Sequence, residues 1–390
     1  MSVYLDNAAT TPIRPEVLEV YKDYLQLLGN PSSVHTSGQQ VRQALEESRE
    51  SIAKVVGCDR SEVIFTSGGT ESDNLAIKGL FWQRRNEDAT RKVIITAGTE
   101  HHGVIDPIEW LENHDGAEVV LVPVSYYGEL DLEWLSSYLA DNHENVALIS
   151  LMWANNETGV ITDIGGVTAM ANKYSIPVHS DAVAAFGHMP VSFRNSGLAA
   201  MSITAHKLGG PVGVGALIVS RNTKLVSIIH GGGQERGLRS GTMNAPAAKA
   251  FALAAERMQA ELEKEIARLN DLRAKLIEGV LSITPEISLT ASNAERLPNI
   301  IHFTLAGASG ESLLFLLDQK GIFVSTGSAC QAGVNRPSHV LIAMGRTEDQ
   351  AKGCLRITFG HESTGADVDA VLEALPQAIE SALKAGLSSQ

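Results

Sequence analysis

The sequence has few cysteines, no long apolar run and no cluster of basic residues. Its three cysteines, Cys58, Cys330 and Cys354, form neither a CxxC pair nor a disulfide framework, which is typical of a reducing compartment. No apolar run reaches the roughly 18 residues that a membrane-spanning helix needs, and the first residues do not have the pattern of a signal peptide. We therefore expect a cytoplasmic protein that does not engage a membrane.

The charge is acidic. The net charge is −14 at pH 7, and lysine and arginine do not gather in any run. Because nucleic acids are bound mainly through clustered basic side chains, we expect no nucleic acid partner.

Several common catalytic signatures are absent. The sequence has no G-x-G-x-x-G after a strand, no Walker motif, no G-x-S-x-G, no H-E-x-x-H and no Cys/His cluster with metal-ligand spacing. These absences argue against a dinucleotide-binding fold, a P-loop nucleotidase, an α/β-hydrolase and a zinc enzyme. We predict no metal site.

What the sequence does contain is an alternation of strands and helices. Short, wholly apolar strands separated by helices predict an α/β fold with a mainly parallel sheet that is covered on both faces. Ser37 is expected to cap the first helix, which Gly57 would end. The remaining predicted helices are 73–82, 104–113, 132–140 and 164–174, and the predicted strands are 62–66, 92–97, 118–122, 146–153, 176–179, 200–204 and 215–220.

A second, smaller α+β domain is predicted after residue 245. A chain of 390 residues exceeds the usual size of one core. The helical pattern of 245–280 can carry the chain out of the first domain, and it is followed by strands at 299–305 and 355–359 and helices at 311–319 and from 367. We assign residues 16–255 to the large domain and residues 1–15 and 256–390 to the small one.

Polar residues follow several predicted strands, at the sheet edge where parallel α/β sheets bind their ligands. Ser67-Gly-Gly-Thr-Glu-Ser72 follows a strand and opens a helix, which suits an anion site or an ordinary strand–helix turn. Lys207 ends a buried strand: burial would lower its pKa and let the amine condense with an aldehyde, although a lysine can also extend from a strand end to water. Asp181 also ends a strand and could alternatively cap a helix.

Together these groups favour pyridoxal 5′-phosphate (PLP) as cofactor. PLP needs an amine for its aldehyde, an anion site for its phosphate and a carboxylate for its ring nitrogen. Lys207, the Ser67–Ser72 turn and Asp181 offer one of each.

The sequence resembles the cysteine desulfurases of the NifS/IscS type, within the class V aminotransferase group of PLP enzymes. The resemblance covers almost the full length and implies the fold of the aspartate aminotransferase-like PLP-dependent transferases. It rests on these runs: Tyr4-Leu-Asp-Asn-Ala-Ala-Thr-Thr-Pro12, Phe65-Thr-Ser-Gly-Gly-Thr-Glu-Ser-Asp-Asn-Leu-Ala76, Thr99-Glu-His101, Asn155-Asn-Glu-Thr-Gly159, His179-Ser-Asp-Ala182, His206-Lys207, His230-Gly-Gly-Gly-Gln-Glu-Arg236, Arg239-Ser-Gly-Thr242 and Gly327-Ser-Ala-Cys330.

The resemblance implies roles for residues at the cofactor. Lys207 would hold PLP as a Schiff base and move the substrate Cα proton. Asp181 would pair with the ring nitrogen, and His101 would stack on the ring and assist proton transfer. The phosphate would be bound by Gly69, Thr70, Thr204 and His206, with Thr242 reaching in from the second subunit of a homodimer.

The resemblance also implies roles at the substrate. Asn156 and Arg356 would hold the amino acid carboxylate, for which a guanidinium fork is well shaped. By strand alternation, Arg356 could equally lie on a solvent-facing surface. Cys330 would be the nucleophile, since its small, polar, glycine-bearing surroundings suit an accessible thiol, whereas Cys58 and Cys354 have the context of buried, inert cysteines.

One position departs from the family pattern. The family usually has a glutamine after Asp181-Ala-Val that donates to the phenolic oxygen of the cofactor, and this chain has Ala184. Losing such a hydrogen bond costs on the order of 1.5–3 kcal/mol at most, which could shift the pKa of the cofactor linkage.

The sequence therefore predicts a homodimeric cysteine desulfurase that converts L-cysteine to L-alanine. The sulfur would be held as a persulfide on Cys330 and passed to an acceptor or scaffold protein, for iron–sulfur clusters or thio-modified nucleosides. Two alternatives stay open at this point: another PLP-dependent lyase of the group, such as a selenocysteine lyase or β-lyase, and a PLP-binding scaffold weakened by Ala184.

Overall fold

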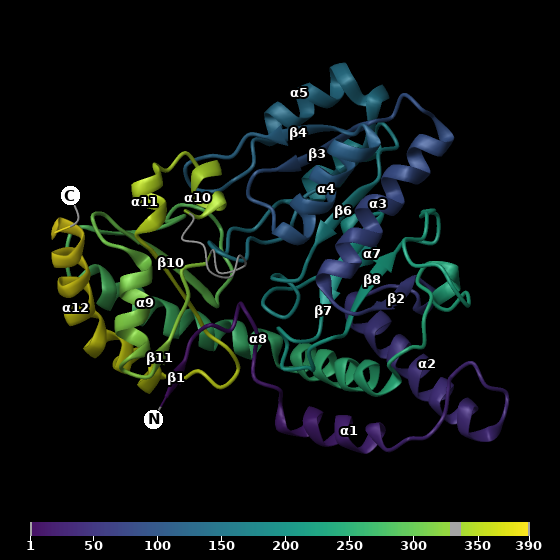
Figure 1. Ribbon diagram of the computed structural model, residues 1–390, viewed down its shortest axis with the longest axis horizontal. Coiled ribbons are helices and arrows are strands. Elements are labelled where there is room, and N and C mark those ends of the chain that lie inside the picture. The colour runs from purple at the N-terminus through teal and green to yellow at the C-terminus, as the bar shows by residue number, and fades with distance from the viewer. Residues whose placement is uncertain (1, 328–336, 389–390) are drawn as a thin grey trace.

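The structure is a computed structural model that describes residues 2–327 and 337–388. The chain forms two parts that lie side by side, with α8 (Ala245–Leu281) running between them (Figure 1). The larger part is built on a seven-stranded sheet and the smaller one on a three-stranded sheet. This mainly parallel α/β architecture confirms the predicted fold class.

The large sheet has the strand order β2-β8-β7-β6-β5-β3-β4. The strands from β7 to β4 pair in parallel, and β8 pairs antiparallel with both β7 and β2. The strands are β2 (Val63–Thr66), β3 (Val93–Ala97), β4 (Glu118–Val122), β5 (Val146–Ser150), β6 (Val178–Asp181), β7 (Ala200–Thr204) and β8 (Gly215–Val219).

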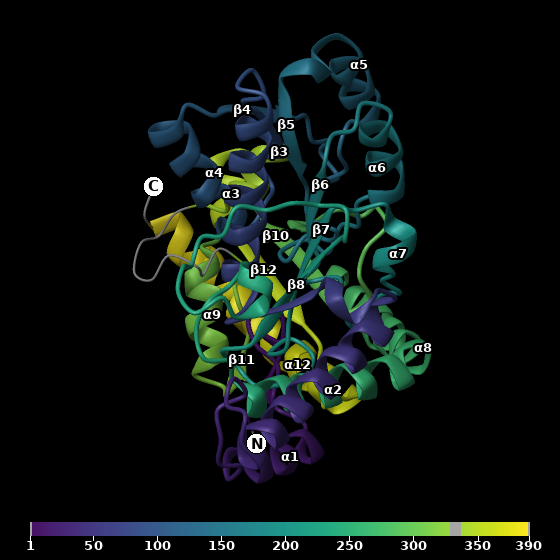
Figure 2. The ribbon, with the colours of Figure 1, turned by 90° about the vertical axis from the view of Figure 1, so that its right-hand side faces the viewer.

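Helices cover both faces of this sheet, as its wholly buried central strands require. Ile94 of β3 packs against α3 and α4, whereas its neighbours Val93 and Ile95 belong to the apolar cluster on the opposite face. Figure 2 shows α3 and α4 on one side of the strands and α5, α6 and α7 on the other. The helices of this part are α1 (Pro15–Leu25), α2 (Thr36–Val56), α3 (Gly69–Glu87), α4 (His102–Asp115), α5 (Leu132–Asn142), α6 (Ile164–Asn172) and α7 (Phe193–Ser196).

The smaller part has its own apolar cluster. Its sheet has the order β12-β10-β9, and the N-terminal strand β1 pairs with β11. Leu262 of α8 belongs to the large cluster, whereas Leu269 and Leu276 of the same helix belong to the small one. The elements are β1 (Val3–Tyr4), β9 (Ile287–Leu289), β10 (Ile300–Leu305), α9 (Gly310–Asp318), β11 (Ile322–Phe323), α10 (His339–Ala343), α11 (Glu348–Lys352), β12 (Cys354–Thr358) and α12 (Gly365–Ser388).

Some boundaries differ from those predicted. Helix α2 is capped by the ring of His35, which accepts from the backbone N–H of Gly38, and not by Ser37. Helix α3 begins at Gly69, four residues before the predicted start, because the glycine turn itself forms the first helical turn. The predicted end of α2 is confirmed, since Gly57 caps the helix in the left-handed region at φ 69°. The division into domains at residues 16 and 255 stays a prediction.

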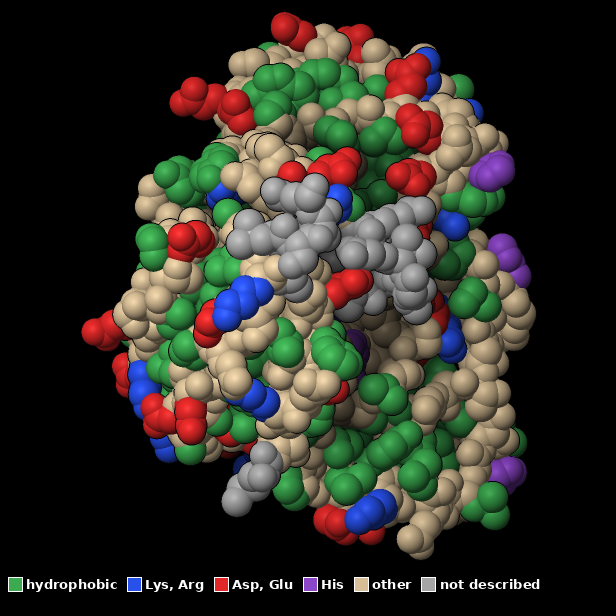
Figure 3. Space-filling view, turned by 60° about the vertical axis from the view of Figure 1, so that its left-hand side comes forward, with side chains coloured by type: hydrophobic (Ala, Val, Ile, Leu, Met, Phe, Trp, Pro, Cys, Tyr) green, Lys and Arg blue, Asp and Glu red, His purple; other side chains and the backbone are tan. Residues whose placement is uncertain are grey.

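No helix within the described residues is long and apolar enough to cross a membrane. Lysine and arginine side chains are scattered among acidic and apolar ones over the face shown in Figure 3, and do not gather into one patch there.

Candidate active site

A cavity of about 290 Å³ opens at the carboxyl ends of β3, β5, β6 and β7. Parallel sheets bind ligands at this edge. The strand ends supply His101, Met152, Asn156, Asp181, His206 and Lys207, and other segments add Ala8, Ala9, Gly69, Thr70, Asp73, Ala154, Val183, Ala184, Gly327 and Arg356. Eight of the predicted site residues thus line one cavity, and the lining includes Gly327 and Arg356 of the smaller part of the molecule.

Lys207 lies three residues after the end of β7. The turn around it is held from the N-terminal segment: the backbone N–H of Thr11 donates to the carbonyl of His206 at 2.9 Å, and the Thr11 hydroxyl donates to the carbonyl of Lys207 at 3.3 Å. Burial, and then the charge of Lys207, lower the pKa of His206 to about 4. His206 is therefore neutral at physiological pH and adds no second cation beside the lysine.

Asp181 is the last residue of β6 and is 7% exposed. One carboxylate oxygen accepts from the backbone N–H of Val183 at 2.8 Å. The next described helix, α7, begins only at Phe193, so the alternative that Asp181 caps a helix is wrong. The side chain instead presents a buried carboxylate to the cavity.

His101 is the N-cap of α4. Its Nδ1 accepts from the backbone N–H of Gly103 at 2.9 Å, so the neutral ring carries its proton on Nε2. Burial lowers the pKa of His101, the charge of Asp181 raises it and that of Lys207 lowers it, and the net direction is downward. A neutral imidazole beside Lys207 can accept or pass on a proton.

The glycine turn for which the sequence predicts an anion site begins α3 and lies at the cavity. The N-cap of α3 is Gly68, which has no side chain to bond the free N–H groups of the first turn. A Cβ on Gly69 would lie 2.8 Å from the Cγ2 atom of Val183, so the turn approaches the segment after β6 more closely than a residue with a side chain allows. Gly69 and Thr70 both line the cavity, so the N-terminal end of α3, where helix N–H groups and the helix dipole favour an anion, lies at the cavity.

Arg356 is 4% exposed and lines the cavity, so the solvent-facing alternative is wrong. Its Nη1 donates to the carbonyl oxygen of Asn156 at 2.9 Å, and its Nη2 donates to Oδ1 of Asp6 at 2.8 Å. These contacts fix the guanidinium plane at the cavity. Asp6 was missed at the sequence level, although it lies within the matched run at residues 4–12.

Two predicted phosphate ligands do not line the cavity. The Thr204 hydroxyl is buried and donates to the carbonyl oxygen of Val214 at 3.3 Å. Thr242 is exposed and outside the cavity of its own chain. The role of Thr204 stays a prediction that this placement does not support, and the role of Thr242 stays a prediction that needs a second subunit.

Cys330 lies outside the described residues. Gly327, which precedes it by three positions in the sequence, lines the cavity. Burial, with neighbouring carboxylates, raises the pKa of both Cys58 and Cys354 to about 12. Those two thiols are poor nucleophiles at neutral pH, as predicted from their sequence context.

Two further acids lie beneath the cavity. Asp73 of α3 lines it and is 1% exposed, and its Oδ1 lies 3.5 Å from Nε2 of His179. Glu100 is equally buried, and its Oε1 accepts from the backbone N–H of Met152 at 2.8 Å. Burial and the nearby charge of Asp181 raise the pKa of both.

These residues fit PLP. An amine, a carboxylate, the N-terminal turn of a helix and a neutral histidine surround one cavity. Gly69 has no side chain, and a Cβ there would meet Val183, so its backbone lies close to the cavity wall. PLP needs an amine for its aldehyde, a carboxylate for its ring nitrogen and an anion site for its phosphate. Fold and site together define the class of PLP-dependent enzymes built on an α/β sheet. Within that class, the chain belongs to the class V aminotransferase family, which it matches over residues 3–371.

The chain is similar to several cysteine desulfurases. It is 48% identical to the IscS-like cysteine desulfurase of Mycobacterium tuberculosis over 99% of this chain and 98% of that protein. It is 39% identical to the cysteine desulfurase NifS of Azotobacter vinelandii over 96% and 92% of the two chains. A solved NifS-like protein superposes with a TM-score of 0.90 at 34% identity, over 98% of this chain and 100% of that one.

Proposed function

We propose that this protein is a PLP-dependent cysteine desulfurase that converts L-cysteine to L-alanine and holds the sulfur as a persulfide on Cys330. The observation that carries the proposal is the convergence of Lys207, Asp181 and Arg356 on a cavity that Gly327 also lines. Relatives named as cysteine desulfurases, similar over almost their whole length, support it.

The cofactor, when bound, withdraws electrons from the Cα of an attached amino acid. The residues around it have separable tasks. Lys207 would hold the cofactor and move the proton of the substrate Cα, with His101 donating the proton that its Nε2 carries. Asp181 would bind the ring nitrogen and keep it protonated. The N–H groups of Gly69 and Thr70, with His206, would bind the phosphate.

Substrate binding would rest on Arg356 and Asn156. The Arg356 guanidinium is already oriented by Asp6 and by the Asn156 carbonyl, and a planar fork binds a carboxylate through two parallel hydrogen bonds. The thiolate of Cys330 would then attack the substrate sulfur. Cys330 is three positions from Gly327 in the sequence, and Gly327 lines the cavity. The high pKa values of Cys58 and Cys354 leave those two thiols protonated.

A homodimer is part of the proposal. Thr242 is exposed and does not line its own cavity, which suits a residue that serves a second subunit. A sulfur acceptor or scaffold protein as partner, and a cytoplasmic location, are likewise proposed.

Colour and turnover test the proposal. Purified protein should be yellow with bound PLP and should form alanine and protein-bound persulfide from L-cysteine in equal amounts. A yellow protein that releases sulfide, pyruvate and ammonia without a protein persulfide would favour a β-lyase. One without turnover would favour a PLP-binding scaffold, and a colourless protein that cannot be loaded with PLP would exclude all three.

A further inference from the structure

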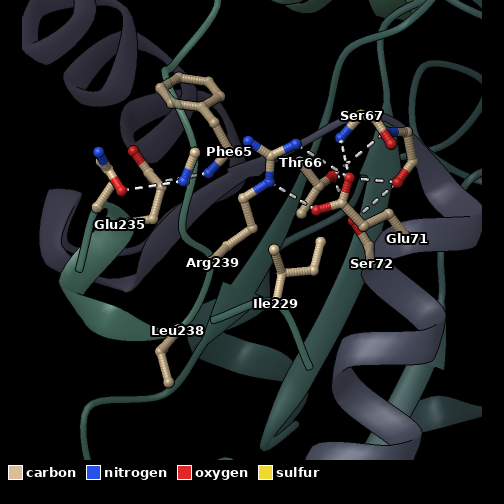
Figure 4. A network of polar contacts seen from close by, with 12 residues as sticks. Phe65, Thr66, Ser67, Glu71, Ser72, Ile229, Glu235, Leu238 and Arg239 are labelled. Atoms are coloured by element: carbon tan, nitrogen blue, oxygen red, sulfur yellow. Dashed lines mark hydrogen bonds and ion pairs between the residues drawn. The ribbon is translucent and has the colours of Figure 1, made fainter. Parts of the chain in front are cut away.

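The segment that follows β8 returns to the glycine turn and is fastened there by an ion pair between Arg239 and Glu71 (Figure 4). A second ion pair joins Glu235 of the same segment to Arg49 of α2. Arg239 donates from Nε to Oε1 of Glu71 at 2.7 Å and from Nη2 to Oε2 at 3.3 Å. Glu235 accepts from Nη2 of Arg49 at 2.7 Å and from the backbone N–H of Phe65 at 2.9 Å. The two pairs therefore fasten this segment to β2 and to the first turn of α3.

Glu71 also holds the turn itself. Its Oε2 accepts from the backbone N–H of Ser67 at 2.8 Å, while its own backbone lies in the first turn of α3. On the inner side of the turn, the hydroxyls of Thr66 and Ser72 are 2.8 Å apart. The Ser67–Thr70 backbone is thus fixed from both sides, with Gly69 and Thr70 left facing the cavity.

The position of Glu71 is electrostatically unfavourable for an anion site unless its charge is balanced. Burial alone would raise the pKa of Glu71, but the hydrogen bonds from Arg239 and Ser67 lower it, so the group is ionised. A cofactor phosphate carries nearly two negative charges, and a carboxylate in the same helical turn would repel it. The side chains of Arg239 and Glu71 are only 20% and 12% exposed, so solvent screens their interaction little.

We propose that the Glu71–Arg239 ion pair positions the Ser67–Thr70 turn for the cofactor phosphate, and that Arg239 neutralises Glu71 so that this turn accepts a dianion. Both are positioning residues, because neither lines the cavity. The proposal rests on the PLP site proposed above.

The test compares two ligands that differ only in the phosphate. Full-length protein stripped of cofactor is titrated with PLP and with pyridoxal, for Arg239→Gln, Glu71→Gln and the double variant. Arg239→Gln should raise the Kd for PLP about tenfold, because an unbalanced carboxylate then faces the phosphate, and should change the Kd for pyridoxal less than about twofold. Glu71→Gln should weaken PLP less, and adding it to Arg239→Gln should recover about threefold of the lost affinity.

Arg221→Gln is the matched control, because Arg221 forms an exposed ion pair with Asp59 at 2.9 Å, away from the cavity. Its two Kd values should be unchanged. If Arg239→Gln weakens the binding of PLP and of pyridoxal equally, the structure is generally disturbed and the proposal is overturned. An unchanged Kd for PLP in Arg239→Gln, or no recovery of affinity in the double variant, would also overturn it. If the unaltered protein binds no PLP, the proposed function fails instead.

Discussion

Arg356→Lys separates substrate binding from cofactor binding. The guanidinium makes two contacts from different nitrogens, to the Asn156 carbonyl at 2.9 Å and to Asp6 at 2.8 Å, and these set the plane of the fork. A lysine keeps the charge but cannot keep both contacts and also bind a carboxylate through two hydrogen bonds. Losing one charge-assisted hydrogen bond to the substrate costs about 1.5–3 kcal/mol, which lowers kcat/KM for L-cysteine about 10- to 150-fold.

The assay measures alanine formation against L-cysteine concentration, alongside the Kd for PLP. We expect the loss chiefly as a higher KM, with PLP affinity within about twofold of that of the unaltered protein, because Arg356 would contact the substrate and not the cofactor. Arg273→Lys is the control. Arg273 also donates to a backbone carbonyl, from Nη1 to the Leu297 oxygen at 2.9 Å, but it does not line the cavity. An unchanged KM in Arg356→Lys, or a loss of PLP affinity equal to the loss of kcat/KM, would refute the reasoning.

Three further outcomes are expected. Lys207→Ala should remove the visible absorbance of the bound cofactor and all turnover, and borohydride reduction of the unaltered protein should label Lys207; a pyridoxyl group on another lysine would contradict the assignment. Ala184→Gln should lower the pKa of the cofactor–lysine linkage in a spectrophotometric titration, because the amide can donate to the phenolic oxygen and stabilise its anion; coincident titrations would show that another donor already serves it. His302→Gln should reduce the loss of folding stability as the pH is lowered from 6.5 to 3. Burial lowers the pKa of His302 to about 3, so in this range the unfolded chain binds one more proton than the folded chain, and stability falls by up to about 1.4 kcal/mol for each pH unit of acidification. Urea unfolding at several pH values measures this, with His114→Gln, at an exposed histidine, as the control.

The large sheet and the residues at its strand ends could be predicted because they depend on local patterns. Wholly apolar strands alternate with helices, and Asp181 and Lys207 lie at or just after the ends of such strands, so a parallel sheet brings them to one edge. Helix α1 was not predicted, and the N-terminal strand β1 pairs with β11, which lies more than 300 residues away in the sequence.

The contacts that orient the site could not be predicted for the same reason. Asp6 and Arg356 are 350 residues apart, and Glu71 and Arg239 are 168 apart, so no spacing rule relates them. The burial of Asp73 also depends on how α3 packs over β6 and β7, which its surrounding sequence does not encode alone. Local sequence thus indicates which groups meet the cofactor, whereas the packing of distant segments sets their orientation and charge.

The most direct test of the central claim is to follow the sulfur atom. Protein treated with L-cysteine labelled at sulfur, then alkylated and digested without reductant, should carry the label on the peptide with Cys330. Cys330→Ser should still bind PLP and show the spectral change that L-cysteine causes, but should carry no label. Label on Cys58 or Cys354, or labelled protein persulfide in Cys330→Ser, would contradict the account.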